Sequence, residues 1–288
     1  MVEIVPLWLV NLLSFMTVFS VMAAIGTTIT PEACFEHIRS PWTLIRGLLC
    51  VLVIVPVIGI ATSFAVGLSL PEKVGIALMV IAPGAPLGLR RALGSGADAG
   101  FAPTLQIAVA VLAVPAVPLW VLVANPLLGT NGIANVLAVA KQVSLAQLLP
   151  LALGAVARRA SPVRSRWLGT IIGRAGAIFL ILAIIGQLID LHYVILSARF
   201  WPVVVAAFTT LAALLTGHMM GGRAPGVGHA MAISGALRNI GLALLVATAN
   251  RTPPTVEVVI VTYAITAILI VSVYSALRGR GLRRRPRA

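Results

Sequence analysis

Charged residues are scarce in this sequence, and acidic residues are the scarcest. Only 10% of the 288 residues are charged, with 21 Lys and Arg against 7 Asp and Glu, and 60% are hydrophobic. Soluble domains contain about one quarter charged residues, so a soluble fold is excluded. Apolar runs recur along the chain, and each can supply the roughly 20 residues that a transmembrane helix needs, whereas a barrel would show short alternating segments. The composition predicts an all-α polytopic membrane protein.

Motifs of common enzyme and ATPase sites are also absent. The chain has no Walker A loop, HExxH or GxSxG sequence, so ATP-driven transport and the familiar hydrolase mechanisms have no support. The two cysteines, Cys34 and Cys50, stand apart from any Cys/His cluster, so we interpret them as small packing residues. We expect a protein that is not an enzyme and that holds no cofactor or metal, apart from a possible coupling ion.

The apolar runs predict about nine transmembrane helices in one membrane domain, residues 1–288. Their connections are short and are punctuated by proline or glycine, so no soluble domain is inserted. The predicted helices are 5–27, 42–67, 72–94, 98–125, 133–157, 167–191, 199–221, 228–250 and 255–277.

Basic residues are distributed unevenly between the two sides of these predicted helices. Fifteen of the 21 lie on one side, only Lys73, Arg199 and Arg251 lie on the other, and three fall within predicted spans. We expect the protein to lie in the cell (inner) membrane. The positive-inside rule then places the C-terminus in the cytoplasm and the N-terminus outside the cell. We interpret the basic tail, 278–288, as a cytoplasmic anchor at the lipid surface, and dispersed basic residues do not favour a nucleic-acid partner.

Two predicted helices carry interruptions near their centres. The first is APGAP, Ala82 to Pro86, in the middle of 72–94, where two prolines remove helical hydrogen bonds and free nearby carbonyls. The second lies in 228–250, where Ser234-Gly235 precedes Arg238-Asn239 at the same expected depth, and we expect a half-helix to begin just after Gly235. Non-helical backbone in a membrane is tolerated only inside protein or beside a water-filled cavity. The pattern predicts a cavity at the midplane.

The two interrupted helices run in opposite directions, which is typical of inverted-repeat transporters. A single proline kink is also ordinary packing in membrane helices, and Asn239 alone is compatible with a bond between helices. An arginine at membrane depth, however, indicates a functional site, because burying its charge there is costly. We expect the following residues to bind a small organic anion: Gly84, Ala85, Ser234, Arg238 and Asn239.

These stretches resemble the bile acid:sodium symporter family. Ile81 to Pro86, followed by Gly96 to Ala99, is similar to its first broken helix and the loop after it, and Gly235 to Leu244 is similar to its second. The resemblance, from about Phe15 to Tyr274, implies two crossing broken helices and alternating access between two subdomains. It implies a panel of 5–27, 133–157 and 167–191 and a core of 42–67, 72–94, 98–125, 199–221, 228–250 and 255–277.

The resemblance also implies where sodium ligands would stand, and this sequence departs from the pattern. Gly88 and Leu89 occupy the first ligand region, Ser234 replaces a glutamate, and Arg238 replaces a glutamine. Losing a carboxylate and adding a guanidinium should weaken a site for a hard cation. Ser234 and Gly235 are weak sodium candidates, so sodium coupling is not expected to be retained.

The sequence therefore favours a secondary active transporter of an organic anion, bile-acid-like or a small carboxylate, working by alternating access. The alternatives are a proton-coupled or uncoupled transporter, or a membrane-embedded sensor or enzyme that uses the same cavity. The histidines His218 and His229 flank one loop, where a proton-shuttling role competes with an ordinary interfacial one. The substrate and the oligomeric state are not specified by the sequence.

Overall fold

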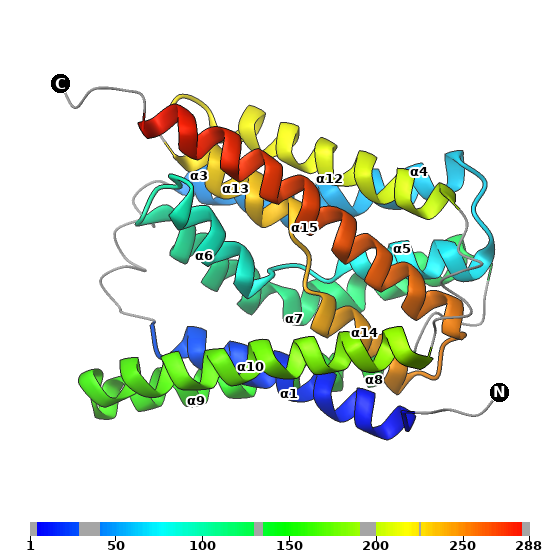
Figure 1. Ribbon diagram of the computed structural model, residues 1–288, viewed down its shortest axis with the longest axis horizontal. Coiled ribbons are helices and arrows are strands. Elements are labelled where there is room, and N and C mark those ends of the chain that lie inside the picture. The colour runs from blue at the N-terminus through cyan, green and yellow to red at the C-terminus, as the bar shows by residue number, and fades with distance from the viewer. Residues whose placement is uncertain (1–4, 29–40, 130–134, 191–199, 225, 284–288) are drawn as a thin grey trace.

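A computed structural model describes residues 5–28, 41–129, 135–190, 200–224 and 226–283 (Figure 1). Within these ranges the chain is helical, without strands, and eight helices are long and apolar enough to cross a membrane. The protein is therefore an all-α integral membrane protein, as predicted. Five of these spans are single helices: α1 (Leu7–Gly26), α7 (Phe101–Leu127), α10 (Pro162–Asp190), α12 (Phe200–Gly221) and α15 (Pro254–Arg283).

The other three spans each combine shorter elements. They are α3 (Pro41–Leu49), η1 (Cys50–Ile54) and α4 (Val55–Ala65); α8 (Val136–Val143), η2 (Ser144–Leu148) and α9 (Leu149–Ala160); and α13 (Val227–Ala236) with α14 (Ile240–Ala249). A ninth predicted span corresponds to α5 (Leu70–Ile81) and α6 (Pro86–Gly94), which are separate short helices. The count of nine spans stays a prediction.

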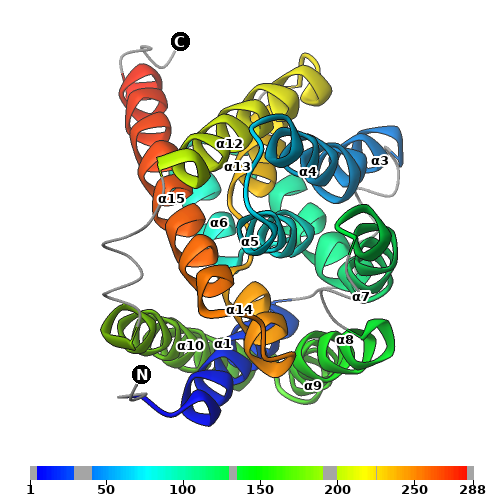
Figure 2. The same ribbon diagram turned by 90° about the vertical axis from the view of Figure 1, so that its right-hand side faces the viewer.

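The helices form two groups. Figure 2 shows α1, α8, α9 and α10 side by side along one face, with the remaining helices stacked on them. Within the first group, α1 and α9 meet backbone to backbone, since a Cβ added to Gly26 would lie 2.2 Å from the carbonyl oxygen of Leu151. Between the groups, α14 packs against α1. These contacts place α14 at the boundary between the two groups.

Helices α12 and α13 are joined by small residues spaced four apart. A Cβ added to Gly217 would lie 2.3 Å from the Cα of Ala232, and one added to Gly221 would lie 2.1 Å from the Cα of Gly228. Small residues at this spacing let helix backbones approach closely in membranes. The glycines therefore allow α13 to pack closely against α12.

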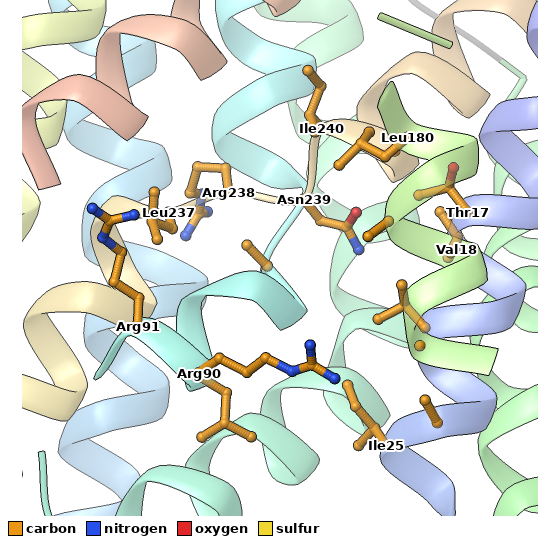
Figure 3. Close-up of a pocket in the computed structure, with 18 of the residues that line it drawn as sticks. Thr17, Val18, Ile25, Arg90, Arg91, Leu180, Leu237, Arg238, Asn239 and Ile240 are labelled. Carbon is orange, nitrogen blue, oxygen red and sulfur yellow. The ribbon is translucent and has the colours of Figure 1, made fainter. Parts of the chain in front are cut away.

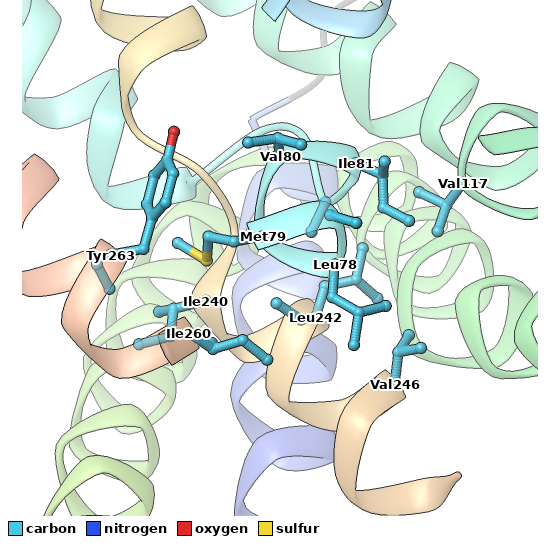
Figure 4. Close-up of a cluster of buried hydrophobic side chains, with 14 of the residues drawn as sticks. Leu78, Met79, Val80, Ile81, Val117, Ile240, Leu242, Val246, Ile260 and Tyr263 are labelled. Carbon is cyan, nitrogen blue, oxygen red and sulfur yellow. The ribbon is translucent and has the colours of Figure 1, made fainter. Parts of the chain in front are cut away.

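The interrupted helices lie at the centre of the protein. Every residue of the most hydrophobic window of Val227–Ala249 is buried, and Figure 4 shows Leu78 of α5 beside Leu242 of α14, and Ile81 of α5 beside Val117 of α7. Neighbouring helices therefore shield these segments from lipid. This burial is the condition under which non-helical backbone is tolerated at membrane depth.

Two π-helical segments interrupt otherwise continuous spans. Each begins six residues before a proline: Cys50 before Pro56, and Ser144 before Pro150. In the first segment the N–H of Val55 bonds to the carbonyl of Cys50, five residues back. Because Pro56 has no N–H, the carbonyl of Val51 lacks a donor at the next π-helical position.

Several predicted boundaries differ from the structure. Helix α10 begins at Pro162 rather than residue 167, because proline is well tolerated in the first turn of a helix. Helix α15 continues to Arg283, so the first residues of the predicted tail are helical. The rest of that tail, residues 284–288, and Cys34 and Arg199 lie outside the described residues.

Candidate functional site

The first break separates α5 from α6 at the predicted APGAP sequence. Helix α5 ends at Ile81 and α6 begins at Pro86. Gly84 has a φ of +76°, a conformation that residues with side chains adopt at a cost, and its carbonyl accepts a hydrogen bond from Nε2 of Gln106, 3.1 Å away. The glycine thus turns the chain, and α7 satisfies the freed carbonyl.

The second break lies later in the chain than predicted. We expected the new half-helix to begin after Gly235, but Ser234 and Gly235 belong to the last turn of α13, and the non-helical residues are Leu237 to Asn239. The physical reason is capping: Oδ1 of Asn239 accepts a hydrogen bond from the N–H of Leu242 at 3.1 Å, which sets the start of α14.

The two breaks meet in space. The backbone N–H of Asn239 donates to the carbonyl of Ala82, 3.0 Å away, and both connecting segments lie at the same level of the bundle (Figure 1). The C-terminal ends of α5 and α13 and the N-terminal ends of α6 and α14 therefore converge on one place. The carbonyl ends carry partial negative charge and the amide ends partial positive charge.

Arg238 lies within this crossing and is only 3% exposed. Its Nη1 donates to the carbonyl of Val51 at 3.0 Å and more weakly to that of Gly235 at 3.5 Å, and its Nη2 donates to the carbonyl of Val80. Val80 and Gly235 are in the final turns of α5 and α13, and Val51 is the π-helical carbonyl described above. Arg238 therefore satisfies backbone oxygens that the helix interruptions release.

A cavity of about 880 Å³ lies between the crossing and helices α1 and α10. Apolar side chains form much of its wall, including Val18, Ile25 and Leu180 (Figure 3). Asn239 points into it, and its Nδ2, which is buried, has no hydrogen-bond partner among the described residues. The crossing thus holds a buried, unused donor beside the cavity.

Arg90 of α6 supplies a cation to the same cavity. Figure 3 shows its side chain extending across the cavity, and a terminal nitrogen lies 3.5 Å from the position of a Cβ added to Gly173 of α10. Arg90 forms no hydrogen bond or ion pair with another residue in the described part of the chain. Arg158, near the C-terminus of α9, and Arg166, near the N-terminus of α10, also line the cavity. Together with Arg90 they define its basic end.

The predicted site residues separate into two groups. Ala85, Arg238 and Asn239 line the cavity, whereas Gly84 and Ser234 are not among the residues that line it. The guanidinium of Arg238 is hydrogen-bonded to backbone carbonyls, so it is less available to a ligand than expected. Sequence reasoning missed Arg90, because a pair of basic residues at a helix end was interpreted as a topology signal.

A separate, partly buried cluster joins the C-terminal end of α6 to α12, α13 and α15. Nε2 of His229 lies 2.7 Å from Oγ of Ser95, Nδ1 of His229 lies 2.7 Å from the hydroxyl of Tyr274, and that hydroxyl also contacts Nε2 of His218. Ser95 donates its hydrogen to the carbonyl of Arg91, so it accepts from His229. In a neutral His229 the other ring nitrogen, Nδ1, accepts from the hydroxyl of Tyr274, and the Tyr274 oxygen then accepts from Nε2 of His218.

Metal binding has no support in the described part of the chain, where no three His, Cys, Asp or Glu residues come together. Asp98 is an acidic residue that follows Arg90 in the chain. It accepts hydrogen bonds from the N–H groups of Gly100 and Phe101 at the start of α7. Asp98 therefore satisfies free N–H groups at the start of α7.

The fold and site define a class: a polytopic helical membrane protein whose two interrupted helices meet beside a central cavity, as in secondary transporters. A sequence profile of the Sodium Bile acid symporter family matches residues 15–199, which is more than half of the chain. The chain belongs to this family. The matched region includes the first break and ends before the second. A comparison with curated proteins finds no match.

Proposed function

We propose that this protein is a secondary transporter that carries an organic anion, bile-acid-like or a small carboxylate, by alternating access. The observation that carries the proposal is the cavity between α1, α10 and the helix crossing, with the guanidinium of Arg90 inside it. Its volume of about 880 Å³ falls within the usual range for small-molecule sites.

The electrostatics of the cavity favour an anion with an apolar body. Arg90 is a cation without an acidic partner among the described residues, and the unpartnered Nδ2 of Asn239 provides a donor. The N-terminal ends of α6 and α14 direct partial positive charge toward the same place. Val18, Ile25 and Leu180 offer the apolar contacts. Arginines at the basic end would concentrate anions at the cavity mouth.

The two groups of helices support a core and a panel that move against each other. The cavity lies between them and reaches the arginine-rich end, while α14 closes against α1 beyond the crossing. With the arginine-rich end in the cytoplasm, this arrangement is the inward-open state. Alternating access would separate α14 from α1 and close the cytoplasmic mouth.

We propose that sodium is not required. The carbonyl of Gly235, one of the two weak sodium candidates, already accepts from Arg238, and the guanidinium beside it repels another cation. Proton coupling remains the alternative, with the His218–Tyr274–His229 cluster as its candidate. A membrane-embedded enzyme is a weaker alternative, because Asp, Glu and His are absent from the described residues that line the cavity.

A binding experiment in detergent tests the proposal. Cholate and benzoate are titrated against the purified protein while its Tm is followed, first for the wild type and then for Arg90→Gln. An exposed arginine outside the cavity lining, Arg164, provides the control Arg164→Gln. We expect at least one anion to raise the wild-type Tm, and Arg90→Gln to weaken its affinity about threefold to tenfold. Equal affinities in all three proteins, or no anion effect at all, would contradict the proposal.

A further inference from the structure

The oxygens around Arg238 have an arrangement that suits a cation. They are three backbone carbonyls, from Val51, Val80 and Gly235, released by a π-helical segment and by the C-terminal ends of two half-helices. Carbonyl ends of interrupted helices carry partial negative charge, and in transporters such ends hold the coupling cation. A hard cation also selects an all-oxygen set of this kind.

We propose that the guanidinium of Arg238 is a tethered cation that permanently fills a cation site at the helix crossing. The side chain replaces a free ion, so the crossing is assembled without one. Each of the three carbonyls that it contacts belongs to a different span, so the same charge holds α13 to α5 and to the segment before α4.

The burial of Arg238 distinguishes this role from an ordinary hydrogen bond. Arg238 is 3% exposed, and its guanidinium forms no ion pair with a carboxylate among the described residues. Glu72, near the start of α5, is eight residues before Val80, about 12 Å along the helix. The charge is therefore balanced by carbonyl dipoles, as the charge of a bound metal ion would be.

The inference deepens the proposed function, because it explains why an anion transporter of this kind would work without sodium. It makes a separate prediction about the folded protein, however. Removing the tethered charge should leave a vacant site that a free cation can fill, whether or not the protein transports anything.

Chemical rescue tests the inference. Arg238→Ala is purified in choline chloride, and its Tm is measured as ethylguanidinium chloride is added at millimolar concentrations, with Arg164→Ala as the control outside the site. We expect Arg238→Ala to melt below the wild type and ethylguanidinium to restore it saturably, by roughly 3 °C at ten times the Kd. The wild type and Arg164→Ala should not respond.

A second pair of variants covers the case in which Arg238→Ala does not fold. Arg238→Lys keeps a cation, and Arg238→Gln keeps hydrogen-bond donors without charge. We expect Arg238→Lys to have the same Tm in sodium chloride and in choline chloride, and Arg238→Gln to be more stable in sodium chloride.

Two outcomes would overturn the inference. One is a Tm for Arg238→Gln that is independent of sodium and equal to that of Arg238→Lys. The other is an Arg238→Ala protein whose Tm responds to ethylguanidinium no more than that of the control. Rescue without any anion binding would support the tethered cation and contradict the proposed transport function, so the two failures are distinguishable.

Discussion

The hydroxyl of Tyr274 connects two histidines, and its removal gives the sharpest test of the partly buried cluster. In Tyr274→Phe, Nδ1 of His229 loses its donor while the ring remains fully buried, and Nε2–H of His218, which is partly exposed, loses its acceptor. An unsatisfied buried group costs about 1–3 kcal/mol, and a partly wetted one costs less, so the expected loss of stability is roughly 2–4 kcal/mol.

The same helix provides a matched control. Tyr263 is 1% exposed, and its hydroxyl lies near Thr210 without forming a hydrogen bond of normal geometry to any described residue. Tyr263→Phe should therefore leave the stability unchanged or increase it slightly. Thermal unfolding in detergent measures both variants, and Tyr274→Phe should lower the Tm by about 5–15 °C. Equal Tm changes in the two variants would refute a stabilising role for the hydrogen bonds of Tyr274.

Three further changes test the packing, the first break and the cavity. Gly217→Leu should destabilise the protein by about 1–3 kcal/mol or more in a denaturation series, because α13 leaves no room for a side chain; Gly94→Leu, where a Cβ meets nothing within 4 Å, is the control and should be neutral. Gln106→Leu removes the donor to the Gly84 carbonyl and should lower stability by about 1–3 kcal/mol; an unchanged Tm would show that water replaces the amide. Arg90→Lys should retain more affinity for cholate than Arg90→Gln in the Tm titration, since it keeps the charge, and the reverse order would contradict a charge-based role.

The sequence predicted the first break well because its cause is local. Two prolines and a glycine within Ala82 to Pro86 prevent a regular helix whatever packs around them, and the structure interrupts the helix there. The second break was placed too early, at Ser234-Gly235. A glycine permits a helix to continue when close packing supports it, whereas the side chain of Asn239 actively caps the next helix.

The partners of Arg238 were beyond sequence reasoning. The carbonyls of Val80 and Val51 are 158 and 187 residues away along the chain, and no pattern in one segment indicates which backbone oxygens another segment will release. The π-helical segments had a signal that was not used: each precedes a proline at the same spacing, before Pro56 and Pro150. Such a proline frees carbonyls upstream of it, and Leu52 illustrates the result, since its carbonyl accepts from the indole of Trp120 at 2.7 Å.

The fold class could be predicted from the composition, because a chain with so few charged residues has few alternatives to folding in a membrane. Long apolar helices follow from hydropathy alone. The cavity could not be predicted from hydropathy, because it depends on how α6 and α10 face each other. Arg90 illustrates the limit: in the sequence it belongs with the other basic residues at helix ends, and only the fold turns its side chain into the cavity.

Uptake into proteoliposomes measures anion transport by the protein itself. Labelled cholate, and separately labelled benzoate, is added outside vesicles that contain the wild type, Arg90→Gln or no protein, in sodium chloride and in choline chloride. We expect saturable uptake of at least one anion by the wild type at the same rate in both salts, and slower uptake by Arg90→Gln. Uptake equal to that of protein-free vesicles, or uptake that disappears when choline replaces sodium, would contradict the proposed function.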